Sequence, residues 1–131
     1  MNDEEKLQFI KNQLIMNLNE NQTKILAQRG ASVAASPREV AEETDYVLTC
    51  LPSIEAAEAV ALGPNGVVSG SRAKAFVNMG TTGSAFSRST AEAMKAAGKS
   101  YLDAPISGGP PGAEAGTLGV MCSGDRETFE A

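Results

Sequence analysis

The chain has 131 residues, 42% of them hydrophobic and 5% aromatic, which suits one globular core and is too small for two. Its 11 basic and 16 acidic residues give a net charge of −5, and no basic run is present, so binding to nucleic acid or to an anionic membrane is disfavoured. The chain has no histidine and only two cysteines, which excludes the usual zinc sites, Cys–His nucleophile pairs and Ser–His–Asp triads.

The sequence also lacks targeting signals of the common kinds. No apolar stretch approaches the roughly 20 residues that a membrane-spanning helix needs, and the N-terminus, Met-Asn-Asp-Glu-Glu, is acidic where a signal peptide is basic. We therefore expect a cytoplasmic protein. Cys50 and Cys122 each lie in an apolar run, so we expect both to be reduced and packed as small hydrophobic side chains.

The first predicted elements are helices. Residues 3–18 form an amphipathic helix in which apolar side chains recur at spacings of three and four, namely Leu7, Ile10, Leu14 and Leu18. A second helix at about residues 23–28 ends before Gly30, a residue type that commonly closes helices, and a short apolar piece follows at residues 32–35. A third helix starts at Ser36, the cap of a Ser-Pro-Arg-Glu capping box, and ends near Thr44.

The middle of the chain alternates strands and helices. Residues 46–51 are a continuous apolar run stopped by Pro52, which predicts a strand buried on both faces. Ser53 caps a helix over residues 54–62, and a second strand follows at residues 75–78 after a turn and a polar stretch.

The last part of the chain continues this alternation. We predict a helix at about residues 84–97, a strand at residues 100–104 and a strand at residues 117–122, with a glycine-rich loop at residues 105–116 between the two strands. A final helix opens at residues 124–125. Strands that alternate with helices indicate an α/β domain with a mainly parallel sheet flanked by helices.

Polar loops follow three of the predicted strands, at the sheet edge where α/β proteins bind ligands. Residues 50–53 could face an anion or a ribose, although a plain turn capped by Ser53 explains them as well. Residues 78–83 offer two hydroxyls and two glycines, which suits either a sugar or phosphate cradle or a turn capped by Thr82 or Ser84. In residues 103–109, a serine precedes two glycines, so backbone amides can approach an anionic substrate closely.

This third loop carries a resemblance to a known family. Residues 103–109, Asp-Ala-Pro-Ile-Ser-Gly-Gly, and residues 112–118, Gly-Ala-Glu-Ala-Gly-Thr-Leu, resemble the substrate loop of the β-hydroxyacid dehydrogenases. That family includes 3-hydroxyisobutyrate dehydrogenase, tartronate semialdehyde reductase and, more distantly, 6-phosphogluconate dehydrogenase. The similarity continues through Thr-Asp-Tyr-Val-Leu-Thr-Cys-Leu-Pro at 44–52 and Asn-Met-Gly-Thr-Thr at 78–82. It covers about residues 21–131 of a single domain and leaves residues 1–20 as an added N-terminal helix.

The resemblance implies a partial Rossmann-like fold, an oxidoreductase, and NADP or NAD as cofactor. It places Leu51 and Pro52 on the adenosine side of the dinucleotide and Thr81 near the nicotinamide ribose. The substrate implied is a small hydroxy-carboxylate. Its carboxylate would be held by Ser107, Gly108 and Gly109.

The sequence departs from the family pattern at three places. It contains no G-x-G-x-x-G turn, and its first glycine is Gly30. Residues 21–23, Asn-Gln-Thr, resemble the family's Asn-Arg-Thr, but Gln22 replaces the arginine that helps to hold the 2′-phosphate of NADP. No residue matches the family's catalytic lysine, and we expect Lys95 and Lys99 to be solvent-exposed. We therefore assign no catalytic residue and no metal ligand.

Three hypotheses follow for the function. The first is a truncated relative of the family that is not catalytically competent alone. The second is a non-enzymatic ligand-binding or protein-interaction module that reuses the loops at the strand ends. The third is one subunit of a split dehydrogenase. Because the family's first strand would lie beside residues 46–51, its loss exposes an apolar edge, and we expect a homodimer.

Overall fold

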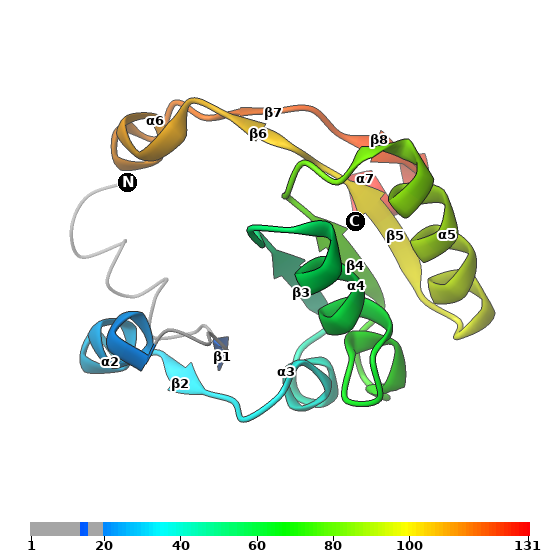
Figure 1. The fold of residues 1–131 in the computed structure, drawn as a ribbon, viewed down its shortest axis with the longest axis horizontal. Coiled ribbons are helices and arrows are strands. Elements are labelled where there is room, and N and C mark those ends of the chain that lie inside the picture. Colours follow the sequence, from blue (N-terminus) through cyan, green and yellow to red (C-terminus); the bar gives the residue numbers. More distant parts are fainter. Residues whose placement is uncertain (1–13, 16–19) are drawn as a thin grey trace.

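The computed structural model describes residues 14–15 and 20–131 and has the predicted α/β architecture (Figure 1). Its main sheet has the strand order β3-β4-β5-β8, in which the first three strands are parallel and β8 is antiparallel to β5. Two further sheets have two strands each: β1 pairs with β2 in parallel, and β6 pairs with β7 in antiparallel. The strands are β1 Leu14–Ile15, β2 Ser32–Val33, β3 Tyr46–Thr49, β4 Ala75–Asn78, β5 Ser100–Asp103, β6 Ile106–Ser107, β7 Gly119–Val120 and β8 Ser123–Gly124.

The helices alternate with these strands, and most begin where the capping residues predict. Figure 1 shows α2 with β1 and β2 at one end of the molecule, while β6, β7 and α6 extend away from the main sheet. The helices are α2 Glu20–Gln28, α3 Pro37–Glu43, α4 Ile54–Leu62, α5 Gly83–Ala96, α6 Gly109–Ala115 and α7 Arg126–Glu130, with a 3-10 turn η1 at Val67–Ser69. The predicted caps of α3 and α4 are confirmed, because Ser36 Oγ accepts from Glu39 N and Ser53 Oγ accepts from Ala56 N, both at 3.1 Å.

One face of the main sheet carries the hydrophobic core. Val47, Phe76 and Tyr101 are register neighbours on β3, β4 and β5, and they are 5%, 0% and 8% exposed. The rings of Phe76 and Tyr101 stack with their centroids 5.9 Å apart. Buried side chains from α3, α4, η1 and α5 complete this core, and they are Ala41, Ala61, Val67 and Met94. Burial of a side chain the size of Phe76 contributes about 2–3 kcal/mol.

The other face is open along β3, so the prediction of a strand buried on both faces is wrong. Tyr46 is 45% exposed and Leu48 is 60% exposed. Within the described residues β3 pairs only with β4, which makes it an edge strand, and the helices that contact it lie on the core face. The strand also ends at Thr49, two residues before the predicted end at Leu51.

The predicted N-terminal helix is wrong at Leu14–Ile15, which form strand β1 and pair with Ser32 and Val33 of β2. The rest of that predicted helix lies outside the described residues. Leucines spaced for a helix also fit a short strand when a parallel partner is present, and here the ladder with β2 decides the structure. In the part of the chain that the structure describes, no helix is both long and apolar enough to cross a membrane.

The glycine-rich segment after β5 is more structured than predicted. Residues 105–116 include strand β6 and helix α6, and the single strand predicted at residues 117–122 is replaced by β7 and β8. Glycine and proline are typical of loops, but Pro110 and Pro111 lie in the first turn of α6, where no backbone donor is needed. Cys50 and Cys122 are exposed, which corrects the expectation that both are packed inside.

Candidate functional site

The candidate site begins with a row of three residues at the carboxyl end of the main sheet. Thr49, Asn78 and Asp103 are the last residues of β3, β4 and β5, and the register places them side by side. Backbone bonds continue this alignment into the loops, because Met79 N donates to Thr49 O at 2.7 Å and Ala104 N donates to Asn78 O at 2.8 Å. The loops that follow the three strands therefore leave the sheet at one level.

The loops after β3 and β4 lie against each other. A Cβ atom at Gly80 would lie 3.4 Å from the carbonyl oxygen and 3.7 Å from the nitrogen of Leu51, so the two backbones lie within about one side-chain atom of each other. Leu51 is half-buried, while Pro52, the next residue, and Thr81, which follows Gly80, are both exposed. The structure thus brings Leu51 next to the loop that carries Thr81, and it leaves the Thr81 and Pro52 side chains on the surface.

The side chain of Asn78 connects the loop after β4 with the end of β5. Its side chain is completely buried, and its Oδ1 accepts from Gly80 N at 3.2 Å. Its Nδ2 donates to Thr82 Oγ1 at 2.7 Å, with longer contacts of 3.4 Å to Gly80 O and to Asp103 Oδ1. Thr82 is at the N-cap position of α5 but makes no side-chain cap bond, and its hydroxyl oxygen accepts from Asn78 instead. We did not single out Asn78 from the sequence, although a buried amide at the end of an apolar strand is a signal that could have identified it.

Ser107, Gly108 and Gly109 lie on a separate arm formed by β6, β7 and α6. All three residues are exposed. Gly108 and Gly109 have φ angles of 127° and 59°, which side chains rarely adopt, and a Cβ at Gly108 would also lie 3.2 Å from Leu118 Cδ2. Figure 1 shows this arm projecting from the carboxyl end of the main sheet. The predicted substrate residues therefore form one exposed loop on the same side as Leu51 and Thr81.

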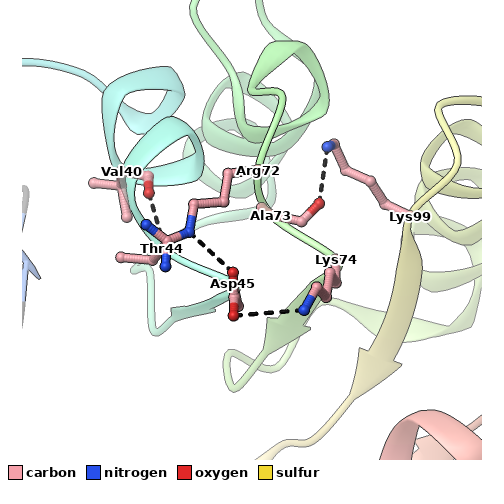
Figure 2. A network of polar contacts seen from close by, with 7 residues as sticks. All are labelled: Val40, Thr44, Asp45, Arg72, Ala73, Lys74 and Lys99. Atoms are coloured by element: carbon pink, nitrogen blue, oxygen red, sulfur yellow. Dashed lines mark hydrogen bonds and ion pairs between the residues drawn. The ribbon is translucent and has the colours of Figure 1, made fainter.

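The amino end of the sheet has a different polar cluster (Figure 2). Asp45 bonds Arg72 Nε at 3.0 Å and Lys74 Nζ at 3.5 Å, and the adjacent guanidinium of Arg72 lowers the pKa of the Asp45 carboxyl. Lys99 is 8% exposed, and its ammonium donates to the carbonyls of Gly70 and Ala73. The expectation that Lys99 is solvent-exposed is therefore wrong, because two carbonyls take the place of water. Lys95 is exposed as predicted.

A groove of about 450 Å³ lies along the outer side of β5, between α5 and the start of α7. It contains Tyr101, whose hydroxyl lies 3.3 Å from Ser87 Oγ, and burial raises the pKa of this tyrosine, with the nearby charge of Asp103 adding to the rise. Its charged lining residues are mixed in sign, namely Arg88, Lys95, Lys99, Asp103 and Asp125. Across the described part of the chain, no group of three or more acidic or cysteine side chains is placed to hold a metal ion.

Residues 21–23 are the Asn-Gln-Thr run that resembles the family's Asn-Arg-Thr. The structure places them inside helix α2, and the strand before them is β1 at Leu14–Ile15.

Comparison with known proteins gives a consistent result. Residues 11–131 match the model of the NAD binding domain of 6-phosphogluconate dehydrogenase, so the similarity begins about ten residues earlier than we expected from the motifs. A probable mitochondrial 3-hydroxyisobutyrate dehydrogenase of Dictyostelium discoideum is 34% identical over 119 residues, which cover 90% of this chain and 37% of the relative. The chain thus spans well under half of that relative's length.

Solved structures show the same similarity. A 3-hydroxyisobutyrate dehydrogenase from Salmonella typhimurium superposes with a TM-score of 0.80 at 30% identity, over 89% of this chain and 41% of the other. The Mycobacterium tuberculosis 3-hydroxyisobutyrate dehydrogenase, solved with L-serine, gives a TM-score of 0.77 at 29% identity, over 86% of this chain and 38% of the other.

Proposed function

The chain belongs to the family of the NAD binding domain of 6-phosphogluconate dehydrogenase, and from this we propose that it supplies the cofactor and substrate loops of an NADP- or NAD-dependent β-hydroxyacid dehydrogenase. The observation that carries the proposal is the close packing of the Leu51 and Gly80 loops at the carboxyl end of a parallel sheet. Dinucleotides bind at this edge in open α/β sheets. In the proposed complex Leu51 and Pro52 contact the adenosine side, and Thr81 contacts the nicotinamide ribose.

The substrate part of the proposal concerns Ser107, Gly108 and Gly109. The Ser107 hydroxyl and the two glycine amides would hold the carboxylate of a small hydroxy acid, which suits their exposure and their lack of side-chain bulk. The similar M. tuberculosis enzyme was solved with L-serine, a small molecule that carries both a hydroxyl and a carboxylate. L-serine is therefore the probe that we would use first.

We further propose that this chain by itself binds and orients ligands but does not transfer hydride. The bound nicotinamide would supply the hydride chemistry. The sequence holds no G-x-G-x-x-G turn for the pyrophosphate, and the buried Lys99 is already bonded to two carbonyls at the opposite end of the sheet. The acid or base would come from residues outside this sequence, either in a longer polypeptide or in a separate subunit.

Calorimetric titration of the chain with NADPH, NADP⁺, NADH, NAD⁺ and L-serine tests this proposal. We expect binding of a nicotinamide dinucleotide and of L-serine. Ser107→Ala should weaken L-serine binding about five- to tenfold, the loss expected for one hydrogen bond, and leave the dinucleotide affinity unchanged. Ser71→Ala is the matched control, because Ser71 is also exposed but precedes β4 at the opposite end of the sheet.

If neither class of ligand binds, the proposal is wrong and a protein-interaction module becomes the better description. That alternative has its own supporting observation in the exposed side chains of Tyr46 and Leu48 on β3.

We also propose that this open face of β3 pairs two copies of the chain in a homodimer. A strand edge with exposed apolar side chains favours association. Sedimentation over a concentration series should show a dimer that Leu48→Asp shifts toward monomer, while Val120→Asp, at an exposed apolar residue on β7, leaves the dimer intact. A strictly monomeric wild-type chain at every concentration would contradict this proposal.

A further inference from the structure

We infer that Asn78 is a positioning residue that couples the loop carrying Thr81 to the strand end that leads to Ser107. The inference rests on the proposed function, since it concerns how the two proposed ligand loops influence each other. Asn78 lies between them in the fold, as the last residue of β4 and the register neighbour of Asp103 on β5.

The orientation of the Asn78 amide is fixed by its partners. Gly80 N–H can only donate, so the atom that it meets at 3.2 Å is the carbonyl oxygen Oδ1. The amide nitrogen Nδ2 then points to Thr82 Oγ1 at 2.7 Å. A carboxylate at this position would keep the first contact but could not donate to its neighbours, and an apolar side chain would lose all of them.

The coupling follows from a count of hydrogens on Nδ2. The amide nitrogen has two hydrogens, and the short bond to Thr82 uses one of them. The other hydrogen is divided between Gly80 O and Asp103 Oδ1, both at 3.4 Å. Because neither of these contacts is short, a shift that strengthens one weakens the other. A ligand that moves the Gly80 loop therefore changes the strength of the contact between Asn78 Nδ2 and Asp103. A ligand that moves Asp103 likewise changes the contact between Nδ2 and Gly80 O.

Backbone hydrogen bonds connect Asn78 and Asp103 to the arm that carries Ser107. Asn78 O accepts from Ala104 N at 2.8 Å, and Asp103 and Ala104 lead directly through Pro105 into β6. Pro105 O in turn accepts from Met121 N at 3.1 Å, which ties the start of the arm to the residue directly after β7. The position of Asp103 thus affects the base of the arm that carries Ser107.

A double-mutant cycle read by amide hydrogen exchange tests the coupling in the unliganded chain. Asp103→Ala frees the second Nδ2 hydrogen for Gly80 O, so the Gly80 amide should exchange about three- to tenfold more slowly, the factor expected of one hydrogen bond. In the Asn78→Ala background, which has no Nδ2 and adds no second carboxylate beside Asp103, Asp103→Ala should leave Gly80 exchange unchanged. The Phe76 amide, at the centre of β4, reports on global stability and serves as the internal reference.

Glu92→Ala is the control for loss of an acidic side chain, because Glu92 is exposed on α5 and should leave Gly80 exchange unchanged. Equal Gly80 exchange in wild type and Asp103→Ala would overturn the inference. So would the same slowing in both backgrounds, because Asn78 would then not carry the effect.

A second measurement connects the coupling to ligands. Calorimetry of NADPH binding with and without saturating L-serine should show about a fivefold change in affinity in wild type and no change in Asn78→Asp. Unchanged coupling in Asn78→Asp would overturn the inference. If wild type binds neither ligand, the proposed function fails, while the exchange cycle still decides the role of Asn78.

Discussion

The two ends of the main sheet contain polar rows of opposite character. At the amino end, Asp45, Lys74 and Lys99 come directly before β3, β4 and β5, and their charges are paired with one another, with Arg72 or with backbone carbonyls. At the carboxyl end, Thr49, Asn78 and Asp103 end the same strands. There Thr49 Oγ1 is buried without a partner among the described residues. The exposed Thr81 directly follows Gly80, whose amide donates to Asn78 Oδ1.

This difference separates a structural polar cluster from a candidate functional one. Charged groups draw attention as catalytic candidates, yet the buried ammonium of Lys99 has its carbonyl partners within the fold. The carboxyl end has fewer charges, but the hydroxyl-bearing residues Thr81 and Ser107 are exposed there, at the sheet edge where α/β proteins bind ligands. Changes at the amino end should therefore alter stability, and changes at the carboxyl end should alter binding.

Lys99→Met should give the largest stability loss among tests of this comparison. Methionine fills similar space, but it leaves the carbonyls of Gly70 and Ala73 without their charged donor in a buried place. We expect the free energy of unfolding to fall by about 2–3 kcal/mol, measured by urea denaturation. Ligand affinity at the carboxyl end should not change in the protein that remains folded.

Lys95→Met is the matched control. Lys95 is exposed on the last turn of α5, so its replacement should change stability by less than about 0.5 kcal/mol. Equal stability of the two variants would mean that the bonds of Lys99 to the carbonyls of Gly70 and Ala73 do not stabilise the fold. The polar residues at the amino end of the sheet could then not be described as structural.

The sequence alone predicted the helices and strands whose bounds are marked by nearby residues, such as a capping serine. Ser36 and Ser53 mark the starts of α3 and α4 because their side chains satisfy free amides within the first turn. The strand at Ala75–Asn78 was predicted at its observed bounds, since it is a short apolar run that leads into the Gly80 turn. The order of strands and helices also predicted that the loops after β3, β4 and β5 leave the sheet at one edge.

The remaining features depend on contacts between distant parts of the chain, which local patterns do not contain. Leu48 belongs to an apolar run, but whether it is covered depends on what packs against the second face of β3. Lys99 is buried because residues 70 and 73 present their carbonyls to it, and nothing near Lys99 in the sequence indicates this. The role of Asn78 likewise depends on Asp103, which is 25 residues away.

Asp45→Asn should have a smaller effect than Lys99→Met, and that effect should depend on pH. The neighbouring guanidinium of Arg72, with a further contribution from Lys74, lowers the pKa of Asp45 below its ordinary value of 3.8. A carboxyl whose pKa is lower in the folded state stabilises the fold above the unfolded-state pKa, and this contribution is lost as the pH falls through the folded-state pKa. At pH 7 the variant should therefore melt slightly below wild type, because its neutral amide pairs only weakly with Arg72.

The pH dependence separates this ion pair from a general effect of substitution. Below about pH 4 the melting temperatures of wild type and Asp45→Asn should converge, because the wild-type carboxyl is then being protonated too. The small difference at pH 7 should also shrink when salt is added, since Arg72 and Lys74 are exposed and Asp45 is partly exposed. Glu43→Gln, at an exposed acid at the end of α3, controls for the loss of one negative charge. A melting difference that persists unchanged at low pH would show that residue 45 acts through its shape or its backbone bonds, and the charge pairing at the amino end would then not contribute to the contrast with the carboxyl end.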